Sequence, residues 1–434
     1  MILPCRIHRA RTRNCVDSLP LALLFAASLL ALPLTQTRAE PVAGAASSTS
    51  EEAGAGWLPS VPPLHITVKA DLGYDDNPGL SASGGGSVFT RENVSLSYDR
   101  LTERTQLRLF ANGGFTHYLN ATNTSNNTAN TSNDDVKTSL TLSLTHIFST
   151  RLSFDANVSA AYQTEPNFET NVGPQNVRSN HFNTTDSFSL AYHWLPRFTT
   201  ITSYTFTRVK YDDASIGMFQ DRVENTFGET FSLSRSSRTN LFLEYRFQAV
   251  NYDTAPNNST TQYALAGFEH HLMEHLVLNV RGGETFRSID TGTDTIDPNF
   301  EGSLAYTSGR LSLGWTARYG VEAPTVEGAA TSITLRTGLT LSYNLSARIS
   351  ARAAVYYSHA DNQGTISSGT GSTGPQDSLD LSLGLRYTIN QHFAVHLDYR
   401  HSSATSPGST PESTQGFASS YSRNSISAGL SFSF

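Results

Sequence analysis

The chain has 434 residues, of which only 38% are hydrophobic and 15% charged, and its formal net charge is −7 at pH 7. Both fractions are low for a soluble protein of one or two packed domains, because serine, threonine, asparagine and glycine fill the difference. A bundle of membrane-spanning helices is excluded as well. Each span needs about 20 consecutive apolar residues, and only the N-terminal segment approaches that length.

Residues 1–39 have the order of a secretory signal peptide. Basic residues at 6, 9, 11 and 13 precede an apolar run over residues 19–34, and Thr37-Arg38-Ala39 ends in a small residue. We expect cleavage after Ala39, which removes both cysteines, Cys5 and Cys15. A permanent anchor helix is less favoured, because the apolar run is short and contains Pro33. The sequence therefore predicts an exported chain without disulfides.

The segment after this leader differs from it in composition and charge. Without residues 1–39 the chain has 25 basic and 36 acidic side chains, a net charge of −11, which argues against a nucleic-acid partner. Residues 40–63 are rich in alanine, glycine, serine and proline, a composition typical of a flexible segment without a packed core. We predict that residues 40–63 form a flexible periplasmic lead-in to the domain that follows.

From Leu64 to the last residue, apolar and polar side chains alternate in 18 runs, most of 12 to 16 residues. In one run Leu241, Leu243 and Tyr245 alternate with the charged Glu244 and Arg246. A period of two places one set of side chains on each face of a β-strand. Such strands are longer than the roughly 9 to 11 residues that a tilted strand needs to cross a bilayer. The pattern predicts an all-β domain over residues 64–434.

The connections between these runs alternate between short and long. Eight are tight, such as residues 149–151 and 390–392, and nine are long, such as residues 119–134 and 164–180. This alternation is typical of the transmembrane up-and-down antiparallel β-barrel of the outer membrane, with short turns in the periplasm and long loops outside. The sheet must close, because an open edge would leave backbone groups unpaired in hydrocarbon. We therefore predict an 18-stranded outer-membrane barrel.

The alternation also predicts which charged side chains face the lumen. Those that we expect to line the pore are Arg108, Glu244, Arg246, Arg281, Arg318, Arg336, Arg352, Asp380, Arg386 and Asp398. Two interpretations fit this set equally well. An arginine track could orient and admit anionic solutes such as acidic sugars, since rings of arginine favour anions. Alternatively, the charges form mutual salt bridges that brace the wall.

Two landmarks carry a resemblance to a known family. Residues 71–77 read Asp-Leu-Gly-Tyr-Asp-Asp-Asn, and the last strand pattern ends at Phe434. With the 18-strand pattern, the chain resembles the β-barrel porins associated with bacterial exopolysaccharide loci. This resemblance implies an outer-membrane channel that passes or assists polysaccharide. The terminal Phe434, on an alternating strand, also resembles the C-terminal signal by which the assembly machinery recognises outer-membrane barrels. For Asp75, Asp76 and Asn77 we favour Asx capping of a loop over a divalent-cation site.

No pattern in the sequence favours an enzyme, a metal or another cofactor. Residues 271–275 match His-x-x-Glu-His in letters, but that zinc motif needs a helix, and here the segment is predicted to be a turn between strands. We predict a porin-like aqueous channel for polar solutes, including exopolysaccharide or sugar acids. The alternatives are a structural or adhesive surface barrel without an open pore and, less favoured, a barrel enzyme. Expected partners are outer-membrane lipid, lipopolysaccharide, the assembly machinery and exopolysaccharide-export proteins.

Overall fold

The computed structural model describes residues 64–81, 85–119, 134–169, 178–290, 294–324, 329–365, 374–405 and 420–434. The predicted signal peptide (residues 1–39) and lead-in (residues 40–63) lie outside these ranges, so both stay predictions. In the described part no helix is long and apolar enough to cross a membrane.

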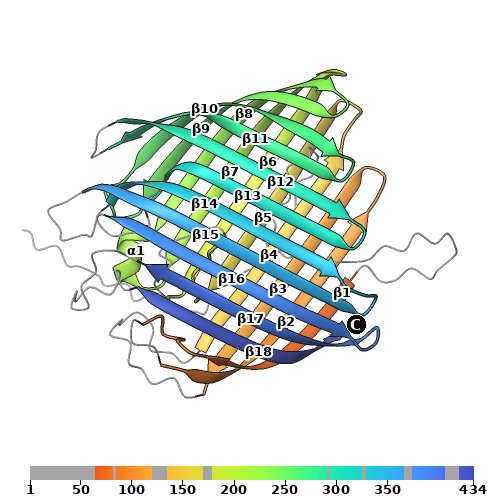
Figure 1. The fold of residues 1–434 in the computed structure, drawn as a ribbon. Helices are drawn as coiled ribbons and strands as arrows, with labels where there is room; N and C mark the ends of the chain where they lie inside the picture. Colours follow the sequence, from red (N-terminus) through yellow and green to blue (C-terminus); the bar gives the residue numbers. More distant parts are fainter. Residues whose placement is uncertain are drawn as a thin grey trace, which may run out of the picture. The chain divides into compact units, whose positions relative to one another are not determined.

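The described residues form eighteen strands and one short helix, drawn in Figure 1. The strands are β1 (Leu64–Asp75), β2 (Ser87–Leu101), β3 (Thr105–Tyr118), β4 (Asp134–Ile147), β5 (Leu152–Gln163), β6 (His181–Leu195), β7 (Phe198–Tyr211), β8 (Arg222–Ser236), β9 (Thr239–Tyr252), β10 (Ser259–Met273), β11 (Leu276–Ile289), β12 (Thr295–Ser308), β13 (Leu311–Glu322), β14 (Ala329–Asn344), β15 (Ile349–Thr365), β16 (Pro375–Thr388), β17 (Phe393–Thr405) and β18 (Tyr421–Ser433). The helix, α1 (Ala214–Gln220), lies between β7 and β8.

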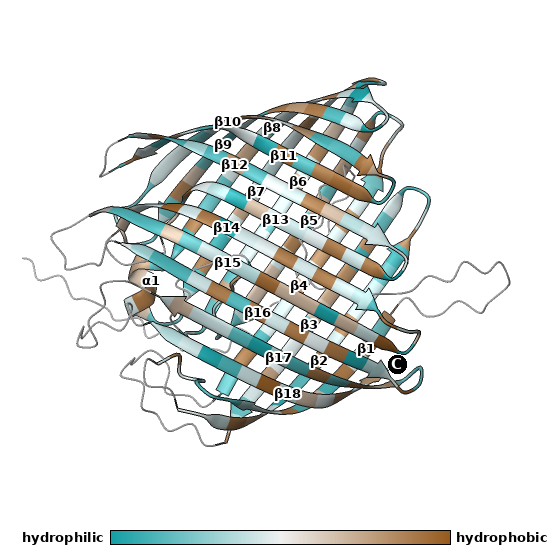
Figure 2. Ribbon diagram, in the orientation of Figure 1, coloured by the Kyte–Doolittle hydropathy of each residue, from teal (hydrophilic) through white to brown (hydrophobic). Residues whose placement is uncertain are grey.

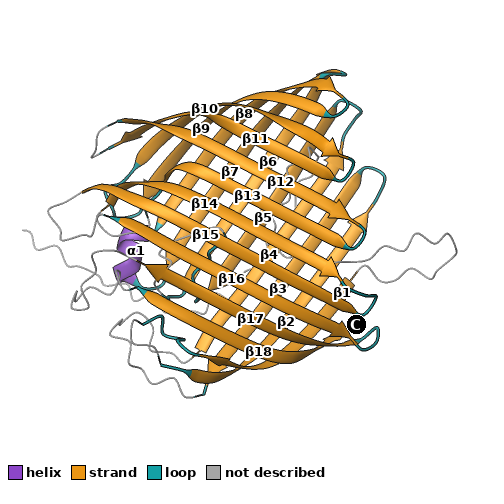
Figure 3. Cartoon of the chain, viewed as in Figure 1, coloured by secondary structure: helices purple, strands orange, loops and turns teal. Residues whose placement is uncertain are grey.

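Each strand pairs antiparallel with its neighbours in the chain, and β1 also pairs with β18, which closes the sheet. In that closing register Val68 stands opposite Phe432. The ladder continues to the last residue, because Ile66 N donates to Phe434 O at 2.9 Å and Phe434 N donates to Ile66 O at 3.0 Å. Figure 3 shows the strands connected by short turns at the end where the chain terminates. The predicted 18-stranded up-and-down barrel is confirmed.

The two faces of the wall differ in chemistry, as the alternation along the strands in Figure 2 shows. On one face large apolar side chains stand exposed, including Leu72 at 59% and Leu243 at 62%. The other face is concave, because Arg246 of β9 reaches Glu301 of β12 at 2.7 Å across two intervening strands. Strands lie about 4.8 Å apart, so side chains three strands apart meet only where the wall curves toward them. The polar face is therefore the lumen.

An arginine placed on the outer face should destabilise the barrel, whereas a charge on the lumen face should not. We predict that Leu243→Arg lowers the free energy of folding into lipid by about 2–4 kcal/mol, the range for arginine near the bilayer midplane. Thr226→Arg is the control, because Thr226 lies on the lumen face of the neighbouring strand, opposite Gln248. It should change the free energy of folding by less than about 1 kcal/mol. Denaturant titration of refolding into vesicles measures both. Equal losses would contradict the assignment of the faces.

Candidate functional site

Most lumen arginines on the wall from β9 to β14 are paired with carboxylates. Arg246 holds Glu301 in a bidentate pair, with Nη1 donating at 2.7 Å and Nη2 at 3.0 Å, and it also contacts Glu244. Arg281 Nη1 donates to Glu244 at 3.0 Å. Glu244 is thus shared by two arginines, and the Arg246–Glu301 and Arg281–Glu244 pairs connect strands that are not neighbours.

The same arrangement continues on β13 and β14. Arg336 Nε donates to Glu322 at 3.0 Å, and Arg318 Nη1 lies 3.8 Å from the same carboxylate. Near the short turns Arg108 donates to Asp99 at 2.7 Å, but both side chains are at least half exposed, so this pair contributes little stability. Among the predicted pore residues, Arg108, Arg246, Arg281, Arg318 and Arg336 therefore fit the bracing interpretation.

Arg352 and Arg386 differ from this braced group. Both lie on the lumen face, and within the described ranges neither has a carboxylate oxygen within 4.0 Å. Asp398 of β17 lies two strands from Arg352, with Gly384 of β16 between them, and is 4.0 Å from His396. Asp380 is held by Arg400 at 2.6 Å. The structure thus places all ten predicted residues on the polar face, and only two arginines among them are left uncompensated. Their part in solute passage stays a prediction.

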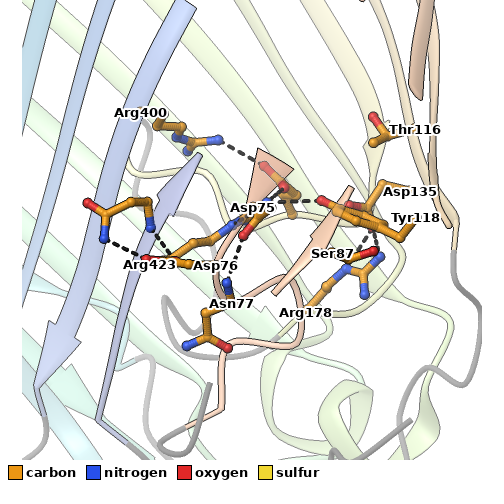
Figure 4. A network of polar contacts seen from close by, with 12 residues as sticks. Asp75, Asp76, Asn77, Ser87, Thr116, Tyr118, Asp135, Arg178, Arg400 and Arg423 are labelled. Carbon is orange, nitrogen blue, oxygen red and sulfur yellow. Dashed lines mark hydrogen bonds and ion pairs between the residues drawn. The ribbon is translucent and has the colours of Figure 1, made fainter. Parts of the chain in front are cut away.

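At the long-loop end, a buried polar network joins the first and last strands (Figure 4). Arg423 of β18 is 7% exposed and donates to Asp75 at 2.7 Å, to Tyr118 Oη at 3.0 Å and to Glu165 at 2.7 Å. Glu165 also accepts from Arg400 Nη1 at 2.8 Å. These partners come from β1, β3, β17, β18 and the segment after β5. One loop residue therefore ties together strands that are far apart around the barrel.

The connection after β5 turns into the lumen, whereas the sequence predicted residues 164–180 as one external loop. Glu165 reaches β17 and β18, with β1 to β4 lying between β5 and β18. Phe168 packs in an apolar cluster with Leu80, Ala404 and Tyr421. The external placement is thus wrong for residues 164–169, since an apolar side chain and a carboxylate both find partners inside. Residues 170–177 lie outside the described residues.

The charge of Glu165 is stabilised by its surroundings. Burial alone would raise the pKa of this carboxyl, but the guanidinium groups of Arg423 and Arg400 outweigh burial and hold its pKa well below the usual range. The inward segment therefore carries a fixed negative charge at neutral pH, compensated on both sides.

A second segment reaches across the mouth from the other side. The helix α1 begins after Asp213, whose Oδ1 accepts from Ser215 N at 2.8 Å, and its Ile216 is only 1% exposed. Gln220 Nε2 donates to Pro324 O, which follows β13, at 3.5 Å. Two inward segments, one after β5 and one after β7, thus narrow the long-loop end of the lumen.

The motif at residues 71–77 holds the barrel closed. Asn77 N donates to Asp75 Oδ1 at 3.0 Å, which confirms the predicted Asx cap. Asp76 accepts from Asn424 N at 2.6 Å and from Asn424 Nδ2 at 2.7 Å, and Asn77 Nδ2 donates to Ser422 O at 3.0 Å. These side chains extend the β1–β18 junction beyond the strand ladder. Their role is structural, and it could not be inferred without the closing register.

Asp71 of the same motif has a partner that sequence analysis missed. Its carboxylate contacts His396 Nε2 of β17, passing over Gly429 of β18, and both side chains are less than 10% exposed. A Cβ at residue 429 would collide with the Asp71 carboxylate, so glycine is required there. The segment at residues 271–275 spans the end of β10 and the turn before β11 rather than a helix, as predicted, and its His271 lies 3.6 Å from Glu269.

Comparisons with known proteins give one family. Residues 64–434 match the family described as putative beta-barrel porin 2, and no curated relative matches. Similar solved structures include OccAB4 of Acinetobacter baumannii, at 9% identity over 86% of this chain and 98% of that one, with a TM-score of 0.40. Outer membrane protein opdK of Pseudomonas aeruginosa is 11% identical, over 86% of this chain and 99% of that one, with a TM-score of 0.40. The siderophore receptor PirA of A. baumannii is 8% identical, over 86% of this chain and 81% of that one, also with a TM-score of 0.40. These values transfer no solute and no site to this chain.

Replacing Glu165 should release the inward segment. With Glu165→Gln the two guanidinium groups lose their shared carboxylate, and local opening of residues 164–169 should become easier by about 1.5–3 kcal/mol, the range for hydrogen bonds to charged groups. Hydrogen exchange of that segment at pH 7, followed by mass spectrometry, should speed up about tenfold or more. Glu103→Gln in a short turn is the control and should leave exchange there unchanged.

The pH dependence of the same contact follows from the lowered pKa of Glu165. The ionised carboxylate stabilises the inward segment fully above the ordinary carboxyl pKa of about 4.3. This stabilisation is lost only as the pH falls through the lower folded-state pKa of Glu165. Protection of residues 164–169, corrected for intrinsic exchange rates, should therefore be equal at pH 7 and pH 5. If protection falls between pH 7 and pH 5 in the unchanged protein but not in Glu165→Gln, the pKa of Glu165 is not lowered by the two arginines.

Proposed function

Because this chain belongs to the family described as putative beta-barrel porin 2, we propose that its outer-membrane barrel is a porin-like aqueous channel that passes polar solutes and favours acidic sugars. The observation that carries the proposal is the closed wall with its charged face inside and its apolar face outside. A lumen lined by charges of both signs requires water, and its side chains set selectivity.

The preference for acidic sugars rests on the unequal pairing of the lumen charges. Arg246, Arg281, Arg318 and Arg336 are neutralised by Glu244, Glu301 and Glu322, whereas Arg352 and Arg386 have no carboxylate oxygen within 4.0 Å among the described residues. A cation without a counter-ion attracts a solute carboxylate more strongly than one in a salt bridge, because it gives up no existing pair. We extend the proposal to exopolysaccharide-export proteins as partners on the periplasmic side.

A second function has specific support. The two inward segments, held by Glu165 and by α1, cross the long-loop end of the lumen. If they close it, the protein is a structural or adhesive surface barrel without an open pore. The two functions differ in one measurable property, the conductance of the folded protein.

Single-channel recording in a planar bilayer tests the proposal. We predict discrete openings that oligogalacturonate blocks and that a neutral maltodextrin of equal length blocks at least about tenfold more weakly. Arg352→Gln with Arg386→Gln should relieve the block, and Arg318→Gln, which removes a paired lumen arginine, is the matched control. Silence from protein with a barrel circular dichroism spectrum and heat-modifiable gel mobility would reject the channel in favour of the closed barrel.

A further inference from the structure

A basic residue immediately precedes every strand that leaves a short turn. Six of these positions are arginine and two are histidine: Arg104, Arg151, Arg197, Arg238, His275, Arg310, Arg348 and His392. They recur once per hairpin around the whole barrel, always at the same step of the turn. We call the six arginines the mouth ring.

The backbone fixes the direction in which these side chains start. The carbonyl oxygen of each of the eight residues accepts a ladder hydrogen bond from the end of the next strand, at 2.7 to 3.0 Å. The pleat therefore extends through this position. The residue that follows opens its strand on the lipid face, as with Phe198, Leu311 and Phe393. Because side chains alternate across the sheet, the basic residue before it belongs to the lumen face.

The mouth ring has no internal counter-ions. All six arginines are exposed, and among the described residues none has a carboxylate oxygen within 4.0 Å. The short turns hold only two acidic residues, Glu103 and Glu274. The long-loop end is different, since Arg400 and Arg423 there are both bound to carboxylates. Within the described ranges, Lys137 and Arg287 near the long loops also have no carboxylate oxygen within 4.0 Å, but the repeated, exposed arginines lie at the short-turn end.

Turn chemistry does not explain this pattern. Tight hairpin turns favour glycine, asparagine, aspartate and serine, which meet the backbone demands of such turns. The turns here contain such residues beside the basic ones, including Gly309 beside Arg310 and Asn390 before His392. Six like charges around one opening repel one another, which opposes folding slightly. The charge therefore points to something outside the chain.

The positive surface continues from the ring into the lumen. Arg352 follows Arg348 by four residues on the same face of β15, and Arg386 lies diagonally across the β15–β16 pair. Lys69 of β1 lies on the same lumen face, opposite Ser431 of β18. None of these three has a carboxylate oxygen within 4.0 Å in the described part of the chain. Asp398 and the Asp71–His396 pair are the nearby acidic groups.

We propose that the mouth ring, continued by Lys69, Arg352 and Arg386, binds a carboxylate-bearing polysaccharide and draws it into the lumen from the periplasmic end. The inference rests on the proposed channel and adds the solute class, the side of entry and the residues that bind it. A polymer with a carboxylate on each sugar contacts several arginines at once, so weak single contacts combine. A charged opening also concentrates oppositely charged solutes and speeds their association at low salt.

The main competing partner is the anionic headgroup layer of the inner leaflet. Two arginines near the same end, Arg100 of β2 and Arg235 of β8, lie on the outer face and are placed to reach it. Arg104 and Arg238 lie in the turns after these same two strands but on the lumen face. The double variants Arg104→Gln/Arg238→Gln and Arg100→Gln/Arg235→Gln thus remove equal charge from the same two hairpins, on opposite faces.

The experiment measures binding of oligogalacturonate to the folded, detergent-solubilised protein by isothermal titration calorimetry at low salt. We expect the variant with all six ring arginines changed to glutamine to lose affinity at least about tenfold, and the Arg104/Arg238 pair to lose about two- to threefold. The Arg100/Arg235 pair should match the unchanged protein. Neutral maltodextrin of equal length should not bind. Heat-modifiable mobility confirms that each variant is folded.

Rates of channel block give the side of entry. The variant Ser81→Cys has a single cysteine after residue 15, and this cysteine lies at the long-loop end. An impermeant thiol reagent added to one side of the bilayer therefore shows the orientation of each inserted channel. Oligogalacturonate should block at least about ten times faster from the short-turn end, and this excess should vanish in the six-arginine variant and at high salt. Equal rates from both sides would overturn the proposal.

Three other results would also overturn it: unchanged affinity in the six-arginine variant, an equal loss in the Arg100/Arg235 pair, or equal binding of maltodextrin. Failure of the ring is distinguishable from failure of the channel. Conductance without oligogalacturonate binding rejects the ring alone, whereas binding by a folded but silent barrel rejects the channel alone.

Discussion

Every backbone donor and acceptor that crosses hydrocarbon must find a partner within the protein, and the rest of this structure depends on that constraint. Seventeen hairpin pairings leave β1 and β18 as edges, and their mutual pairing removes both. The side chains of Asp75, Asp76 and Asn77 add bonds beyond the ladder, to Arg423, Asn424 and Ser422. Once the wall is closed, the pleat assigns each residue to lipid or to lumen, and the charged pairs of β9 to β14 lie on the wet side.

The lumen charges are arranged in three zones along the barrel. Near the long loops a buried group of charges is paired around Glu165 and Arg423. In the middle of the wall, shared glutamates connect the arginines of β9 to β14. Toward the short turns Arg352, Arg386 and the six arginines of the mouth ring have no carboxylate oxygen within 4.0 Å among the described residues. Paired charges stabilise the wall, whereas we propose that the unpaired charges at the short-turn mouth act on solutes.

Sequence reasoning predicted the strands and their faces because both follow from a local period of two. The alternation of short and long connections was equally visible and gave the topology. Contacts between distant strands were not predictable, since Arg246 meets Glu301, and His396 meets Asp71, only in the register of the closed barrel. The inward turn of residues 164–169 was missed for a related reason: Glu165 is an ordinary polar loop residue until β17 and β18 place two arginines beside it.

The central claim is that one face of each strand borders water in the lumen and the other borders lipid. Single cysteines placed in turn at residues 241 to 248 of β9, in a chain lacking Cys5 and Cys15, test it directly in liposomes. A small, charged, water-soluble thiol reagent should modify positions 242, 244, 246 and 248 and should spare positions 241, 243, 245 and 247. Modification without this period of two, or none at the even positions, would contradict a wall that separates a wet lumen from lipid.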